Sequence, residues 1–591
     1  MNAVPEASPA LIAAREAEAL VAECLHNHSC FLLEAGAGAG KTYSLVEALK
    51  HLIEHEGSKL RKGNQRIACI TYTNAATAVI NSRIDSSPLV FVATVHAFCW
   101  SLIRNFQPAL RSLVSAMPQW AEKLAEVGGI GNRSIEYELG HRRVTTDAVT
   151  LHHDDVLELM VALLPNAKFQ TLLAQQYPFV LIDEYQDTDL TVMAGMRAHL
   201  FGRVSGPMIG LFGDHWQRIY DKTCGHVAHE ALLEIGKKAN FRSGTRIVDV
   251  LNRMRPELPQ AAKDKGSVGS AIVFHTNDWQ GDRRSGAGGG HWKGDLPAEV
   301  AHAYLATLIK QLKLEDWDFS PQRTKVLMLT HNVLASEQGY DSIAKIFSYT
   351  DQYIKKEDPL VAFFCDALEP ACAAFLSKRF GEMFSLLGGS TPPIPSHADK
   401  VAWSSSMEGL AKVRLEGTIG QVLDYMLKYA HPRLPDSVLS DLREAAEWRG
   451  AEGEEVPRKV QQIRHLRDIP YREVIALHKF IDGHTPFATK HSVKGDEFDN
   501  VLVVLGRGWN KYNFDQFLQW SEVGVPAGKE DAFERNRNLF YVCCSRPTTR
   551  LALLFTQELS DISLGVLSNW FNGAIESAPP PREPMTIPPA G

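Results

Sequence analysis

The sequence predicts an α/β fold built from two parallel sheets with helices on their faces, and three observations support this prediction. Short runs of apolar, often β-branched residues alternate along the chain with amphipathic stretches of helical periodicity. The apolar runs have no polar face, as is typical of strands that helices cover on both sides. They fall into two groups, one before about residue 215 and one after about residue 270, so we expect two sheets.

The individual elements follow from the same patterns. Buried strands are expected at 31–33, 67–71, 180–182, 208–212, 325–329, 501–505 and 551–555, and helices at 44–55, 75–84 and 534–542. The segments 285–290 and 389–397 are rich in glycine or proline and are expected to be loops. The proline-rich segment 576–591 has no apolar periodicity and is expected to be a disordered tail.

Composition and charge restrict the class of protein. Of the 591 residues, 45% are hydrophobic and 22% are charged, which excludes collagen-like, coiled-coil and globally disordered chains. The formal net charge is −7, so any nucleic acid would be bound through a local groove. Nine cysteines without a CxxC pair indicate a reduced, cytosolic protein. No apolar run approaches the ~20 residues of a membrane span, and no secretory signal begins the chain. We therefore expect a cytoplasmic protein without a membrane partner.

The segment after the first expected strand has the composition of a phosphate-binding loop. Alternating glycines let backbone N–H groups surround a phosphate, and the following helix adds its positive N-terminus. Lys41 would contact the β- and γ-phosphates of a nucleotide such as ATP, and the Thr42 hydroxyl would ligate Mg²⁺. A glycine-rich turn that happens to precede a lysine is the alternative. The predicted cradle consists of Ala35, Gly36, Ala37, Gly38, Ala39, Gly40, Lys41 and Thr42.

Two adjacent carboxylates follow the strand expected at 180–182. Asp183 and Glu184 would be costly to bury unless a cation offsets their charge. Asp183 is therefore expected to hold Mg²⁺, and Glu184 to polarise the attacking water. Such acidic pairs also occur as ordinary helix caps, so the prediction depends on the cradle being present in the same chain.

Six further segments lie in a fixed order along the chain, two of them between the cradle and DEYQDT and four after DEYQDT. Together these eight motifs resemble those of superfamily 1 helicases of the UvrD/Rep type, and the resemblance extends from about residue 31 to about residue 555. The six segments are ITYTNAATAVINSRI (70–84), VATVHAF (92–98), LFGDHWQRIY (211–220), NFRS (240–243), TKHSVKGDEFDNVLVV (489–504) and RNLFYVCCSR (537–546).

The resemblance implies two RecA-like P-loop NTPase domains with the nucleotide in the cleft between them. Gln217 would sense the γ-phosphate, and Arg242 and Arg546 would stabilise charge on the transferring phosphoryl group. Phe241 would stack on the base, and Glu497 would accept a hydrogen bond from the ribose. Taken singly, an arginine of this kind is more often a solvated surface residue and a phenylalanine more often a core residue.

Nucleic acid requires donors along a phosphate track and flat side chains for the bases. On the motif positions, the resemblance implies such roles for Tyr72, Thr73, Asn74, Thr94, His96, Tyr220, His491 and Ser492. The expected partner is single-stranded DNA or DNA ends.

The chain departs from the family pattern around the base and along the strand. Residues 1–34 contain no glutamine, although the family carries one there that reads adenine, and Tyr43 stands where an arginine is common. We therefore expect GTP and other NTPs to be hydrolysed comparably to ATP. Lys222 stands near the position of a stacking Trp-Arg pair, so translocation is a weaker expectation than NTP hydrolysis.

The resemblance also predicts the domain organisation. Residues 1–104 and 161–235 would form the first RecA-like domain, interrupted by a short helical insertion at 105–160. Residues 236–345 and 481–575 would form the second, interrupted by a reduced, mainly helical insertion at 346–480.

Two segments, 212–222 and 239–259, also resemble the helicase-like subunit of Gabija-type bacterial anti-phage systems. In those systems the partner is an OLD-family nuclease with a Toprim domain. Three functions remain open at this stage: a UvrD-type NTPase that moves along or unwinds DNA, a DNA-end sensor whose hydrolysis regulates a nuclease, and a catalytically silent subunit. The complete set of motif residues argues against the third.

Overall fold

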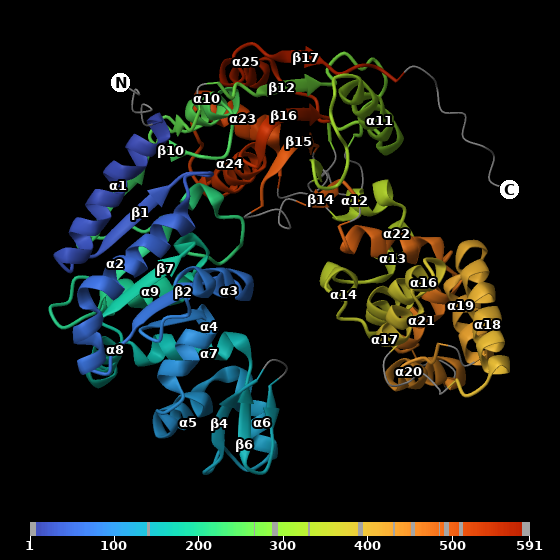
Figure 1. Ribbon diagram of the computed structural model, residues 1–591, viewed down its shortest axis with the longest axis horizontal. Helices are drawn as coiled ribbons and strands as arrows, with labels where there is room; N and C mark the ends of the chain where they lie inside the picture. Colours follow the sequence, from blue (N-terminus) through green and yellow to red (C-terminus); the bar gives the residue numbers. More distant parts are fainter. Residues whose placement is uncertain are drawn as a thin grey trace.

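Two six-stranded sheets, each parallel throughout, organise the computed structural model (Figure 1). The α/β fold with two RecA-like domains is thereby confirmed. The structure describes residues 8–138, 142–264, 266–285, 293–328, 331–387, 394–429, 432–450, 455–483, 485–489, 496–506 and 512–581.

The first sheet has the strand order β3-β2-β7-β8-β1-β9. Its apolar side chains alternate between two cores: Leu32 and Ile70 face one core, whereas Leu33 and Cys69 face the other. The strands are β1 (Phe31–Ala35), β2 (Ile67–Thr71), β3 (Val90–Thr94), β7 (Phe179–Asp183), β8 (Met208–Gly213) and β9 (Leu233–Lys237). The helices of this domain are α1 (Pro9–His26), α2 (Lys41–Lys62), α3 (Asn74–Arg83), α4 (Val95–Ile103), α8 (Ala167–Gln176) and α9 (Leu190–His199).

The second sheet has the order β14-β13-β15-β16-β12-β17, and apolar cores likewise cover both of its faces. Its strands are β12 (Ser270–His275), β13 (Thr324–Met328), β14 (Phe487–Thr489), β15 (Phe498–Leu505), β16 (Pro547–Phe555) and β17 (Ile575–Ser577). Its helices are α10 (Thr245–Met254), α11 (Ala298–Leu314), α12 (His331–Gln338), α23 (Phe514–Val523), α24 (Glu530–Cys544) and α25 (Asp561–Trp570). A two-stranded sheet of β10 (Ala239–Asn240) and β11 (Ala261–Ala262) lies between the two large sheets in the sequence.

The first insertion differs from the helical prediction because it contains a small sheet of β4 (Ser134–Tyr137), β6 (Ala148–Leu151) and β5 (Arg143–Val144). Val149 and Leu151 of this sheet belong to the core on one face of the first large sheet. Short alternating strands of this kind were not distinguishable from loops by periodicity. The helices of the insertion are α5 (Gln107–Ala116), α6 (Ala121–Glu126) and α7 (His153–Leu163).

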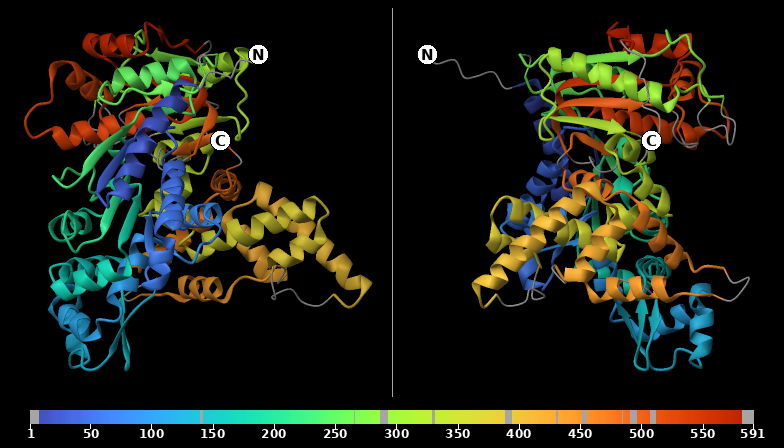
Figure 2. Two further views of the ribbon diagram at one scale, coloured as in Figure 1. Left: turned by 60° about the vertical axis from the view of Figure 1, so that its left-hand side comes forward. Right: turned by 90° about the vertical axis from the view of Figure 1, so that its right-hand side faces the viewer.

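The second insertion is helical, as predicted, and has a hydrophobic core of its own. Figures 1 and 2 show it as a separate body that projects away from both sheets. One stretch, Gln352–Leu376, is long and apolar enough to cross a membrane, but 56% of its most apolar window is buried inside this body. The helices are α13 (Asp341–Ile346), α14 (Thr350–Ile354), α15 (Pro359–Phe363), α16 (Glu369–Leu376), α17 (Phe380–Leu387), α18 (His397–Glu416), α19 (Ile419–Tyr429), α20 (Asp436–Glu447), α21 (Arg458–Asp468) and α22 (Arg472–Ile481).

Each of the seven predicted strands and three predicted helices coincides with an observed element. Leu329, the last residue of the strand expected at 325–329, lies outside the described residues, as does most of the two expected loops. The first residues of the expected tail are ordered, since β17 pairs with β12 and Ala578 is buried. Residues 582–591 lie outside the described part of the chain.

Candidate nucleotide and nucleic-acid sites

The glycine-rich loop joins β1 to α2 at the carboxyl edge of the first sheet. Gly38 and Gly40 have φ angles of 75° and 74°, a region that disfavours residues with a Cβ. A Cβ on Gly38 would also lie 2.6 Å from the side-chain oxygen of Asn240. The Lys41 ammonium reaches back to the carbonyl oxygen of Ala35 at 3.4 Å. The loop therefore has the backbone that a phosphate cradle requires, with its lysine directed across it.

Residues of the second domain contact the same loop. The Asn240 side-chain amide donates to the carbonyl oxygen of Ala37 at 3.1 Å, and the Phe241 backbone N–H donates to that of Gly38 at 2.8 Å. From α24, the Tyr541 hydroxyl accepts a hydrogen bond from the Ala37 N–H at 3.2 Å. Residues of the second domain thus hold the cradle, which belongs to the first domain.

The predicted acidic pair lies at the end of β7. Asp183 is buried, whereas Glu184 is half-buried and has a left-handed φ of 47°. The Gln186 amide donates to the Glu184 carboxylate at 2.5 Å. An uncommon backbone conformation costs free energy for a residue with a Cβ, and such conformations cluster at functional sites because the surroundings enforce them.

Gln217 and Arg546 meet across the two domains. Gln217 lies in the short 3₁₀ helix η3 (His215–Gln217), and its side-chain oxygen accepts a hydrogen bond from the Arg546 guanidinium at 3.0 Å. Arg546 is 1% exposed. Burial, together with the neighbouring charge of Arg242, lowers the pKa of Arg546 to about 10, and the charge of Glu184 opposes this shift. The guanidinium therefore stays charged at neutral pH although it is desolvated.

Arg242 has partners within its own domain. Its guanidinium donates to the carboxylate of Glu497 at 3.0 Å and to the carbonyl oxygen of Ser545 at 3.1 Å. Glu497, the predicted ribose acceptor, is exposed and is occupied by this ion pair. Phe241 lies beside the cradle, because a Cβ on Gly40 would be 3.8 Å from its ring. Arg242 thus contacts Ser545, the residue immediately before Arg546.

A buried lysine that the motifs did not indicate lies on the side of the cradle where Tyr43 is exposed. Lys237 ends β9, and its ammonium donates to the Ser44 hydroxyl at 2.6 Å and to the Glu18 carboxylate at 3.2 Å. It also lies 5.9 Å from the Tyr43 ring centre. Burial lowers the pKa of Lys237, and Glu18 opposes the shift. A lysine at the end of an edge strand carries no sequence signal that separates it from a solvated residue.

The residues at this edge fit a magnesium–nucleotide. Gly38 and Gly40 place no Cβ over the loop, and the Thr42 hydroxyl and Asp183 carboxylate offer the oxygen ligands that Mg²⁺ prefers. Within the described residues, no group of three or more His, Cys, Asp or Glu side chains could hold a metal alone.

The predicted nucleic-acid residues of the first domain gather at the ends of β2 and β3. Since these strands are parallel and Thr71 pairs with Thr94, the residues that follow them lie at one edge. Tyr72 is 44% exposed and stacks on Tyr220 with ring centres 5.3 Å apart. The hydroxyl of Thr73 caps α3 by accepting a hydrogen bond from the backbone of Ala76.

The other predicted nucleic-acid residues differ in their exposure. Thr94 and His96 are half-buried, and the His96 ring lies 4.7 Å from that of His153. Burial and the charge of His153 lower the pKa of His96. Asn74, the first residue of α3, is exposed. His491 and Ser492 lie outside the described residues.

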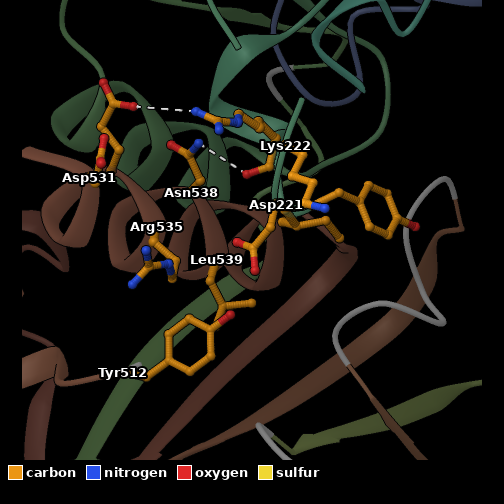
Figure 3. A pocket seen from close by; sticks show the side chains of 11 residues that line it. Asp221, Lys222, Tyr512, Asp531, Arg535, Asn538 and Leu539 are labelled. Atoms are coloured by element: carbon orange, nitrogen blue, oxygen red, sulfur yellow. Dashed lines mark hydrogen bonds and ion pairs between the residues drawn. The ribbon is translucent and has the colours of Figure 1, made fainter. Parts of the chain in front are cut away.

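An open cavity of about 230 Å³ adjoins this edge, between the loop after η3 and helix α24 (Figure 3). Asp221 and Lys222 line one side, and Tyr512 and Asn538 line the other. The Asn538 amide donates to the carbonyl oxygen of Arg218 at 3.1 Å, which ties α24 to the loop. The cavity therefore spans the domain boundary and presents charges of both signs.

Known proteins are similar to the first domain and to most of the whole chain. The family described as "AAA domain" matches residues 17–223. The chain is 23% identical to the Gabija protein GajB of Bacillus cereus (strain HuB5-5) over 90% of its own length and 93% of that protein. The predicted resemblance to UvrD-like helicases and to GajB is confirmed.

Two helicases match shorter parts. The chain is 26% identical to the ATP-dependent DNA helicase Rep of Buchnera aphidicola subsp. Baizongia pistaciae (strain Bp), over 38% of this chain and 40% of Rep. It is 31% identical to the ATP-dependent DNA helicase UvrD1 of Mycobacterium tuberculosis (strain ATCC 25618 / H37Rv), over 15% of this chain and 12% of UvrD1. With the fold, these likenesses support a helicase-like, nucleotide-binding NTPase.

Proposed function

We propose that the protein is a nucleic-acid-stimulated NTPase of the UvrD type that couples ATP hydrolysis to movement along, or unwinding of, DNA. The observation that carries this proposal is the contact between Gln217 of the first domain and Arg546 of the second. A desolvated arginine at the boundary between two nucleotide-binding domains is the arrangement that an arginine finger needs. The proposed domains are 1–104 with 161–235, and 236–345 with 481–575.

The residues of the first domain would bind and orient the substrate. The loop N–H groups and Lys41 would hold the phosphates, with Thr42 and Asp183 holding the magnesium ion. When bound, Mg²⁺ neutralises charge that develops on the phosphates. Glu184 would accept a proton from the attacking water, and Gln217 would orient that water or sense the γ-phosphate.

Arg242 and Arg546 would stabilise the transition state from the second domain. Arg242 now donates to Glu497, so a nucleotide would exchange this ion pair for a phosphate contact. The Glu497 side chain is 61% exposed, so water can solvate the carboxylate after the exchange and the lost ion pair costs little. Phe241 would then stack on the base, and the released Glu497 would accept from the ribose.

The edge that carries Tyr72 and Tyr220 would take single-stranded DNA, with bases stacked on the rings and phosphates near Thr73, Asn74, Thr94 and His96. We also place His491 and Ser492 on this track. Binding of the strand would favour the closed arrangement of the two domains and thereby raise the rate of hydrolysis.

We propose a base site with weak selectivity beside Tyr43. Lys237 supplies a donor and Glu18 an acceptor on this side of the cradle. Adenine carries an amino donor at C6 where guanine carries a carbonyl acceptor, so a side that offers both kinds of group can accept either base. GTP is therefore expected to have a kcat/KM within about tenfold of that for ATP, a difference of ~1.4 kcal/mol.

Steady-state hydrolysis with and without a single-stranded oligonucleotide tests the proposal. Lys41→Ala should abolish hydrolysis, and Glu184→Gln should bind Mg–ATP without turnover. Lys50→Ala is the matched control on the same helix, because Lys50 is exposed and forms an ion pair with Glu47. Hydrolysis at the wild-type rate by Glu184→Gln would contradict the assignment of the base.

A second function is favoured by the similarity to GajB, which covers 90% of this chain. In this alternative the protein senses DNA ends within an anti-phage defence complex, and its hydrolysis regulates a nuclease subunit of the OLD/Toprim type with little unwinding. A fluorescent strand-displacement assay separates the two functions. Robust NTP-dependent unwinding by the isolated chain would favour the first.

We propose a cytoplasmic location for either function. Eight of the nine cysteines are buried, and burial raises the pKa of several of these thiols, such as Cys69 and Cys99. Buried thiols of raised pKa are unreactive core residues, as is typical of a reducing compartment.

A further inference from the structure

A buried arginine of the second domain bridges two carboxylates of the first. Arg255 follows the last turn of α10, is 2% exposed, and donates to Asp214 at 2.6 Å and to Glu34 at 2.8 Å. Glu34 precedes the phosphate cradle on β1, and Asp214 follows β8 on the adjacent strand. Two buried carboxylates on neighbouring strands would repel one another, and the guanidinium between them reduces this repulsion by offsetting part of their charge. The His215 ring also contacts Glu34, at 2.7 Å.

The bridge continues to the residues proposed to act on the phosphate. The second carboxylate oxygen of Asp214 accepts a hydrogen bond from the Gln217 amide at 2.7 Å. The Gln217 oxygen in turn accepts from Arg546. Arg255 thereby fixes Asp214, Asp214 fixes the amide end of Gln217, and only one orientation of that amide then offers its oxygen to Arg546.

Aromatic packing keeps Arg255 in place. Its guanidinium lies 5.1 Å from the Trp216 ring centre, and Arg537 of α24 covers the same ring at 4.3 Å. Helix α10 is a rigid element of ten residues, with Arg242 just before its first turn and Arg255 just after its last.

We propose that Arg255 is a positioning residue for hydrolysis: by bridging Glu34 and Asp214 when the domains are closed, it holds Gln217 in the orientation that Arg546 requires. This inference rests on the proposed NTPase function. It assigns the second domain a role in catalysis in addition to its two arginine fingers.

The test is Arg255→Lys compared with Arg253→Lys. Lysine keeps the charge but cannot donate to two carboxylates in a planar fork. Arg253 lies two residues earlier, on α10, and is exposed. Its guanidinium donates hydrogen bonds to Asn569 and Asn572. We expect Arg255→Lys to lower kcat at least tenfold while the KM for Mg–ATP changes less than threefold, and Arg253→Lys to stay within twofold of wild type.

A double-mutant cycle separates positioning from a purely structural role. If Arg255 acts through Gln217, the loss caused by Arg255→Lys should largely disappear in a Gln217→Ala background. Additive losses, or a wild-type kcat for Arg255→Lys in an active chain, would overturn the inference. A wild-type chain that hydrolyses no nucleotide would instead contradict the proposed function.

Asp214→Asn is the second variant if Arg255→Lys does not fold. Its amide nitrogen would face the Gln217 amide, so donor would meet donor and Gln217 would turn away from Arg546. A tenfold or greater fall in kcat with intact Mg–nucleotide binding is expected, whereas an unchanged kcat would count against the proposal.

Discussion

The carboxyl edge of the first sheet has two halves of opposite character. At the ends of β1, β7 and β8, charged and polar groups are buried and already paired, many of them with the second domain. At the ends of β2 and β3, Tyr72, Thr73 and Asn74 are exposed, and the Tyr72 ring stacks on that of Tyr220. One half is assembled in advance, whereas the other is open.

This difference has a physical reason. A charge that is to act in a dry cleft must be neutralised before the ligand arrives, because an unpaired buried charge costs several kcal/mol. Stacking faces and hydroxyl groups remain hydrated at little cost, so they can wait for a polymer strand. We therefore expect substitutions in the buried half to change kcat or stability, and substitutions in the open half to change strand affinity.

The largest effect is expected for Arg546→Ala. Loss of the buried guanidinium should lower kcat by roughly 10³-fold, about 4 kcal/mol, because Arg242 would then be the remaining arginine of the second domain at the transferring phosphate. Quenched-flow or steady-state hydrolysis measures this directly, with Arg550→Ala as the control from the same segment. An unchanged kcat would remove the distinction between the two halves.

Acid should destabilise the buried half specifically. Burial alone would raise the pKa of Glu34, but hydrogen bonds and charges from His215 and Arg255 outweigh it and lower the pKa to about 2. A depressed folded-state pKa stabilises the protein above the unfolded value near 4.5, and this stabilisation is lost as pH falls from 4.5 towards 2. The loss should be of the order of 3 kcal/mol.

Denaturant unfolding at a series of pH values measures this loss. The wild-type free energy of unfolding should fall more steeply with decreasing pH below 4.5 than that of Glu34→Gln. The difference between the two slopes should correspond to the uptake of at most one proton on unfolding. Equal slopes for the two proteins would show that Glu34 is not held by the network.

A smaller effect is expected in the open half. Tyr72→Ala should weaken binding of a single-stranded oligonucleotide by about 1–3 kcal/mol, because one base loses its stacking face. Tyr72→Phe should retain most of the affinity. Fluorescence anisotropy measures both, and Tyr349→Ala is the control, because Tyr349 is a tyrosine of the second insertion that is more exposed than Tyr72. A larger loss for Tyr349→Ala would move the strand away from the first sheet.

The sequence predicted seven of the twelve strands of the two large sheets because buried parallel strands read as continuous apolar runs, and it predicted the cradle because the cradle needs glycine at fixed positions. Strands β3, β9, β12, β14 and β17 were not predicted. The edge strand β9 escaped prediction because only Ile235 and Lys237 of its five residues are buried. The small sheet of the first insertion escaped prediction because strands of two to four residues leave no usable periodicity.

The same limits apply to the candidate sites. The resemblance to UvrD/Rep helicases implied roles for Gln217 and Arg546, which the structure brings into contact. It gave no sign of the bridge between Arg255, Glu34 and Asp214, because 41 or more residues separate its arginine from either acid. Partners that meet only through the packing of two domains are not encoded in local spacing.

Calorimetric titration of the full chain with the magnesium complex of a non-hydrolysable ATP analogue, with and without a single-stranded oligonucleotide, tests the central claim most directly. If strand and nucleotide favour the same closed arrangement, the strand should tighten nucleotide binding by the same factor by which the nucleotide tightens strand binding. A nucleotide affinity that the strand leaves unchanged, or no binding of Mg–nucleotide at all, would contradict the account.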